Sequence, residues 1–343
     1  MGLLELVSNF GPGGTGFEIA LALITLSIII SGICIGLGIA FRSKKLKRFG
    51  EEELLQAVIN AAILGVFALL VSLLTDVSLD LAPENATTCN LTYTYPGIGT
   101  VVSNQSLAMF AACELDSIES GSFDFTEQTS RAVNILSFAS DIEIETGIVN
   151  YKPFGGLSST AHTLSNILSR TSLYQSLLTA NILLLMFTNL SMLSVFLPLG
   201  LIFRSFFITR KIGGVLLATV VSLYLIYPLI LLVILPVNTD VIYSPLVNLT
   251  EFNSRYQPEL LYRDLSAPDS ITEFNTELSH TSTRQDLVES TYGLTEAAVG
   301  IEGGLLFYSL ILPIIGITIT LISLFHLSRL FSSEFITTAV ELI

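Results

Sequence analysis

The residue types that most often carry catalysis or bind metals are few and scattered in this sequence. His162, His280 and His326 lie far apart, and none belongs to an H-E-x-x-H pair or to closely spaced cysteines that would hold zinc. The chain also lacks the G-x-x-x-x-G-K-[ST] loop that holds nucleotide phosphates and the G-x-S-x-G turn of serine hydrolases. We therefore expect no enzyme, no cofactor and no metal, and a partner or an ion gradient would supply the energy for any transport.

Basic residues form two groups, each beside a long apolar run. Such groups could contact a phosphate backbone, or they could only mark the cytoplasmic side of a membrane protein. Both interpretations stay open for the seven residues, which are Lys44, Lys45, Lys47, Arg48, Arg204, Arg210 and Lys211.

The composition is that of a membrane protein. Of the 343 residues, 51% are hydrophobic and 13% are charged, and the mean hydropathy is +0.71. Five apolar runs reach the roughly 20 residues that a helix needs to cross a bilayer. They predict transmembrane helices at residues 17–41, 55–74, 177–203, 213–236 and 303–327.

The charge of the loops predicts their sides of the membrane. No basic residue precedes the first run and RSKKLKR follows it, so the amino terminus (residues 1–16) should lie outside and the carboxyl end inside. The cytoplasmic segments are then 42–54, 204–212 and 328–343, and the acidic exported domains are 75–176 and 237–302. The sequence thus predicts an all-α, multi-pass protein of the plasma membrane.

The positions of possible modification sites are consistent with the predicted exported segments. N-x-S/T triplets at Asn85, Asn90, Asn104 and Asn248 fall in the exported segments, where glycosylation takes place. Two cysteines, Cys89 and Cys113, share the first exported domain, and we expect them to form a disulfide there.

Several segments carry signs of particular structure. Gly32, Gly36 and Ala40 form a small-residue stripe that would let another helix approach closely. Within the first exported domain, residues 83–105 suggest irregular or β structure, and 106–119 and 126–145 suggest helices. A helix should also rise from about residue 157 into the third run, and another should lead from 284–300 into the fifth.

The order of these features resembles a known family. Five spans, a large exported loop between spans two and three, and the hairpin LPLGLIFRSFFITRKIGG are similar to the channel subunit of conjugation (type IV secretion) machines, the TrbL-like family, and its archaeal DNA-import relatives, the CedA-like proteins. The resemblance covers most of the chain as topology and about 25 residues as sequence.

The resemblance implies a passive channel or base-plate subunit. It would assemble with copies of itself, with a pilin-like protein and with a separate motor ATPase, and it would contact DNA in transit. The seven basic residues would then form the inner mouth of the channel. Acidic, triplet-rich exported domains would suit an archaeal cell surface.

Two other functions remain open from the sequence. The chain could be a structural scaffold of a pilus, secretion or cell-surface complex that transports nothing itself. It could also be a small-solute permease, although the predicted spans show no internal repeat and hold few ionisable residues.

Overall fold

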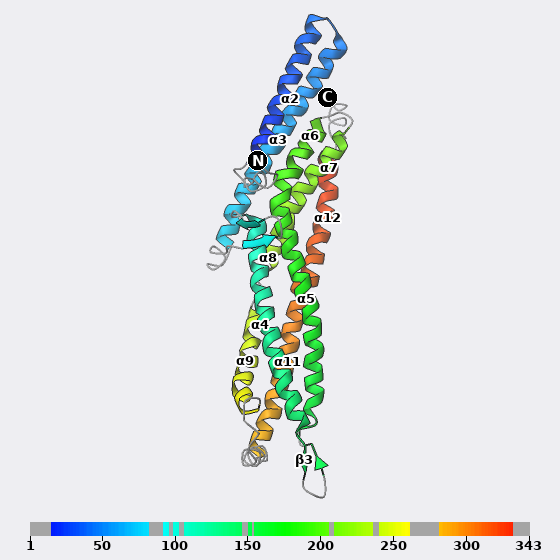
Figure 1. Cartoon of the computed structure of the whole chain (residues 1–343). Coiled ribbons are helices and arrows are strands. Elements are labelled where there is room, and N and C mark those ends of the chain that lie inside the picture. The colour runs from blue at the N-terminus through cyan, green and yellow to red at the C-terminus, as the bar shows by residue number, and fades with distance from the viewer. Residues whose placement is uncertain are drawn as a thin grey trace. The chain divides into compact units, whose positions relative to one another are not determined.

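A computed structural model describes residues 15–81, 92–95, 99–102, 106–145, 150–152, 154–205, 209–235, 240–260 and 281–331 (Figure 1). The chain divides into two compact units, and we describe each by itself. The first unit comprises Met1–Glu114, Asn181–Ile234 and Pro313–Ile343, and the second comprises Leu115–Ala180 and Leu235–Leu312.

The described chain is almost entirely helical, as predicted. Its strands are two short antiparallel pairs, β1 (Thr92–Tyr95) with β2 (Gly99–Val102) and β3 (Ile144–Glu145) with β4 (Asn150–Tyr151). The first pair falls in the segment predicted to be irregular or β.

Five helices are long and apolar enough to cross a membrane, which confirms the predicted number of spans. They cover Leu21–Ala40, Lys44–Leu73, Leu157–Arg204, Arg210–Ile234 and Val288–Phe331. The third and fifth have 48 and 44 residues, about twice the length that a bilayer requires.

The first two spans form a hairpin of α2 (Thr15–Ala40) and α3 (Lys44–Leu81). The segment 42–54, expected to be a loop, is helical from Lys44 onward. Ion pairs one helical turn apart, Lys47 with Glu51 and Arg48 with Glu52, favour this early start. The remaining turn is tight, and Arg42 adopts a left-handed backbone with φ of 50°.

Three spans contain a π-helical turn that ends two residues before a proline. These turns are η2 (Met192–Phe196), η3 (Ser222–Ile226) and η5 (Phe307–Ile311), and Pro198, Pro228 and Pro313 follow them. Proline has no N–H and its ring clashes with the carbonyl four residues earlier. A wider turn relieves that clash and lets the helix continue.

After these turns the helices resume. The third span is α5 (Leu157–Ser191), η2 and α6 (Leu197–Ser205); the fourth is α7 (Arg210–Val221), η3 and α8 (Tyr227–Ile234); the fifth is α11 (Thr281–Leu306), η5 and α12 (Leu312–Phe331). In the first unit they pack on α2 and α3 around Leu64, Phe67, Met192 and Tyr224. The rings of Phe67 and Tyr224 lie 6.3 Å apart.

The second unit packs α4 (Leu107–Asp141) from Leu115 onward, the first part of α5, α9 (Asp240–Leu260) and α11 around a buried apolar core. Helix α4 merges the two helices predicted at 106–119 and 126–145. Helix α9 was not predicted; its segment contains Pro245 and Pro258, and proline disfavours a helix interior. It is tied to α4 by Asn253 Nδ2, which donates to the Gln128 carbonyl at 2.8 Å.

Candidate functional site

The hairpin between α6 and α7 brings two backbones into direct contact. A Cβ on Gly213 would lie 2.3 Å from the Arg204 amide nitrogen and 2.6 Å from the Gly200 carbonyl oxygen. Only glycine permits so close an approach. Gly213, one of the glycines in this hairpin, therefore lets the backbone of Arg204 lie directly against α7.

Arg204 is buried, although the sequence placed it in a cytoplasmic turn at 204–212. It belongs to the last turn of α6 and is only 3% exposed. Its Cζ lies 5.9 Å from the centre of the Phe331 ring. Neither Nε nor Nη1 has a hydrogen-bond partner within the described part of the chain. A buried guanidinium with two unused donors is costly unless an anion satisfies them.

Arg210 opens α7 and forms the second basic group of the site. Its Nη2 lies 3.5 Å from Oε1 of Glu53 on α3, and each side chain is 14% exposed. Arg210 also acts electrostatically on Arg204. This pair was not predicted from the sequence, which does not show that Glu53 on α3 lies beside the start of α7.

Two further polar side chains follow Glu53 on α3, and both are buried. Gln56 and Asn60 are 6% and 2% exposed, and the side-chain oxygen of each has no hydrogen-bond partner among the residues that the structure describes. Positions 53, 56 and 60 share one helix face by their spacing. That spacing was visible in the sequence and could have identified the stripe.

Four of the other predicted basic residues lie elsewhere on α3, and Lys211 directly follows Arg210. Lys44, Lys45, Lys47 and Arg48 precede Glu53 by five to nine residues, about 8–14 Å along α3. They are exposed, as is Lys211. Of the seven, the structure thus places Arg204 and Arg210 close enough to interact electrostatically, and it pairs Arg210 with Glu53.

This arrangement is suited to binding a phosphate or carboxylate. A guanidinium donates in a planar fork that matches such anions, and it stays charged at all physiological pH values. Glu53 compensates part of the positive charge at Arg210. We name Arg204, Arg210 and Glu53 the hairpin site.

The two glycines of the predicted packing stripe lie open among the residues that the structure describes. An added Cβ on Gly32 or Gly36 would meet no described atom within 4 Å. Close packing of α2 on α3 instead uses Gly38, beside Lys47, and Gly50, beside Ile35. The stripe with Ala40 therefore remains a prediction about a contact with a second chain.

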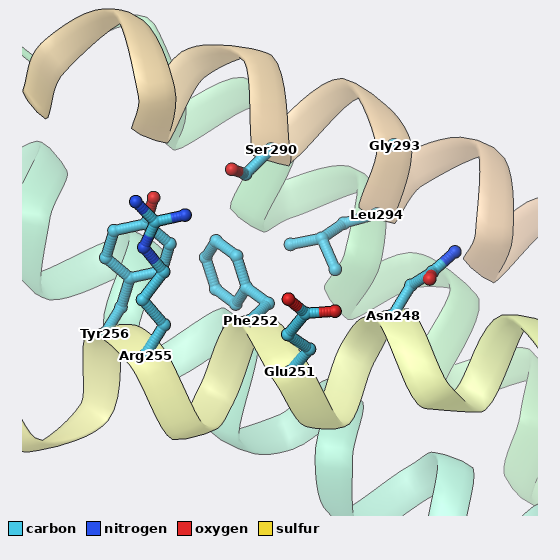
Figure 2. Close-up of a pocket in the computed structure, with 8 residues that line it drawn as sticks. All are labelled: Asn248, Glu251, Phe252, Arg255, Tyr256, Ser290, Gly293 and Leu294. Atoms are coloured by element: carbon cyan, nitrogen blue, oxygen red, sulfur yellow. The ribbon is translucent and has the colours of Figure 1, made fainter. Parts of the chain in front are cut away.

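Most predicted modification sites lie outside the described residues. These are Cys89, Asn85, Asn90 and Asn104. Cys113 is buried in α4, and its disulfide with Cys89 stays a prediction. Asn248 is exposed on α9 and lies beside a cavity between α9 and α11 (Figure 2).

Comparison with known protein families, with characterised proteins and with solved structures gives no match for this chain. Among the described residues, no three His, Cys, Asp or Glu side chains are placed to hold a metal ion. The hairpin site and the helical architecture are therefore the basis for a functional proposal.

Proposed function

We propose that this chain is a non-catalytic subunit of a conjugation-like DNA translocation channel in the plasma membrane. The observation that carries the proposal is Arg204, a buried guanidinium whose Nε and Nη1 have no hydrogen-bond partner among the described residues, with a second arginine, Arg210, acting on it electrostatically. Because DNA presents one phosphate per nucleotide, such a pair would contact a strand in transit without reading its sequence.

Two further parts of the proposed machine are a motor ATPase and additional copies of this chain. A nucleotide-binding motif is absent from the sequence, so a separate motor ATPase would drive the DNA. Helix α2 exposes Ile29, Ile30 and Ile33 beside the open glycine stripe, and these surfaces would pack against further copies of the chain in the bilayer. A pilin-like protein completes the proposed assembly.

The orientation belongs to the same proposal. With the amino terminus outside and the carboxyl end inside, the hairpin site would face the cytoplasm, where the motor would deliver or receive the strand. The acidic exported domains would then carry the predicted disulfide and glycans. These assignments rest on the distribution of lysine and arginine among the loops.

Gene deletion followed by complementation tests this function. We expect deletion to abolish DNA transfer between cells, and the variant R204E/R210E, once shown to insert at the wild-type level, to restore less than a tenth of it. The matched control is R131E, which reverses an exposed arginine on α4. Normal transfer after deletion would overturn the proposal. Normal transfer with R204E/R210E would leave only the scaffold function.

A further inference from the structure

The second unit contains a cavity that the proposed channel does not use. It lies between α9 and α11 and has a volume of about 250 Å³ (Figure 2). This is below the roughly 300–1,000 Å³ of pockets for drug-sized ligands, so its occupant would be smaller.

The floor of the cavity is apolar. Phe252 and Leu294 line it and are 4% and 2% exposed. On the α11 side, Gly293 leaves space, because an added Cβ there would meet no atom within 4 Å among the described residues. A small aliphatic or aromatic group would therefore fit against this floor.

The rim carries one charge of each sign. Glu251 and Arg255 lie one helical turn apart on α9, and Figure 2 shows both side chains extending from α9 toward α11. The Arg255 Cζ lies 5.5 Å from the centre of the Tyr256 ring. A ligand with a single net charge would meet repulsion at one end of this rim, whereas a ligand with both charges would meet attraction at both.

Tyr256 supplies a third and independent indication of a ligand. It is 5% exposed and lines the cavity, yet its hydroxyl has no hydrogen-bond partner within the described chain. An unsatisfied buried hydroxyl typically costs about 1–3 kcal/mol. A polar ligand in the cavity would remove that cost.

We propose that this cavity binds a small zwitterion with an apolar side chain, namely an α-amino acid. Glu251 would accept hydrogen bonds from the ammonium group, and Arg255 would donate to the carboxylate. Phe252 and Leu294 would contact the apolar side chain. The Tyr256 hydroxyl would hydrogen-bond to one of the polar groups. This site is independent of DNA transport, so either proposal can fail without the other.

Calorimetric titration of the purified full-length protein with L-leucine tests the site. The reference protein is T250A, which removes the N-x-T triplet at Asn248 without changing a residue that lines the cavity. We expect saturable binding of leucine, and at least tenfold weaker binding of leucinamide, N-acetyl-leucine and glycine. Each of these three probes lacks one feature that the cavity recognises.

Variants assign the two charges separately. E251Q should weaken leucine binding at least tenfold and abolish the preference for leucine over N-acetyl-leucine, and R255Q should do the same for leucinamide. G293L should fill the cavity and abolish binding, and circular dichroism would confirm that it folds. The control E289Q changes an exposed residue of α11 outside the cavity. Absence of saturable leucine binding to folded protein, or binding that survives both G293L and the two charge variants, would overturn the proposal.

Discussion

The backbone of Arg204 lies against Gly213, so closely that a Cβ at position 213 would stand 2.3 Å from the Arg204 amide nitrogen. This contact joins α6 to α7 and fixes the position of the Arg204 backbone, from which the buried guanidinium extends. It also links the glycines of the hairpin motif to the basic residue that the motif contains.

Replacing Gly213 with alanine should therefore open the hairpin. The added methyl group would meet backbone atoms, which cannot move aside as a side chain can, so we expect a loss of about 3 kcal/mol in stability. The matched control is G65A, where a Cβ meets no described atom within 4 Å and alanine favours the helix. Thermal unfolding in detergent measures both, and equal stability of the two variants would refute the close contact.

The pair between Glu53 and Arg210 predicts a rescue by charge exchange. E53Q should destabilise the protein by about 2 kcal/mol, because it removes the carboxylate that pairs with Arg210. This loss is smaller than that for a fully buried ion pair, because both side chains are partly exposed. The double variant E53R/R210E should recover at least half of that loss. For comparison, R48Q breaks an exposed pair with Glu52 and should cost less than about 0.5 kcal/mol. Failure of the exchange to recover any stability would contradict the pairing.

Glu114 on α4 predicts a pH dependence of stability. Burial raises the pKa of this carboxyl above its ordinary value of 4.5. The folded chain therefore keeps this proton at pH values where the unfolded chain has lost it, and stability falls as the pH rises from 4.5 through the raised pKa. E114Q should flatten this fall and be more stable than wild type at neutral pH. D124N, at an exposed position of α4, should leave the wild-type profile unchanged.

The proposed orientation predicts which cysteines a membrane-impermeant reagent can label. In a background with Cys34 replaced by alanine, K45C and K211C should react only after the cells are opened. S165C, on the exposed face of α5 in the second unit, should react in intact cells. Labelling of K45C or K211C from outside would reverse the topology and move the hairpin site to the cell surface.

Long-range arrangement explains most of what the sequence could not predict. Hydrophobicity was sufficient for the number of spans, because each span must satisfy its own backbone in the bilayer. The prolines Pro198, Pro228 and Pro313 are visible in the sequence, although the π turns that precede them are not. Helix α9 was missed because tertiary packing of Phe252 and Asn253 outweighs its two prolines.

The hairpin site shows the same division. Arg204 and Arg210 were identified as basic residues near a hairpin, but the burial of Arg204 and the ion pair of Arg210 with Glu53 depend on how α3 packs beside α6 and α7. Loop charge predicted an exposed turn, because local sequence does not show which neighbouring helix covers a residue. The polar stripe of Glu53, Gln56 and Asn60 was the local sign that this face of α3 could pack against other polar residues.

Formaldehyde crosslinking during DNA transfer, followed by immunoprecipitation of this protein, tests the central claim most directly. Lys211 supplies a reactive amine beside the hairpin site. We predict that the transferred DNA is recovered with the wild-type protein, in excess of DNA that is not being transferred, and that R204Q/R210Q loses this excess. Transfer at the normal rate with no such excess on the wild-type protein would contradict a DNA channel built around Arg204.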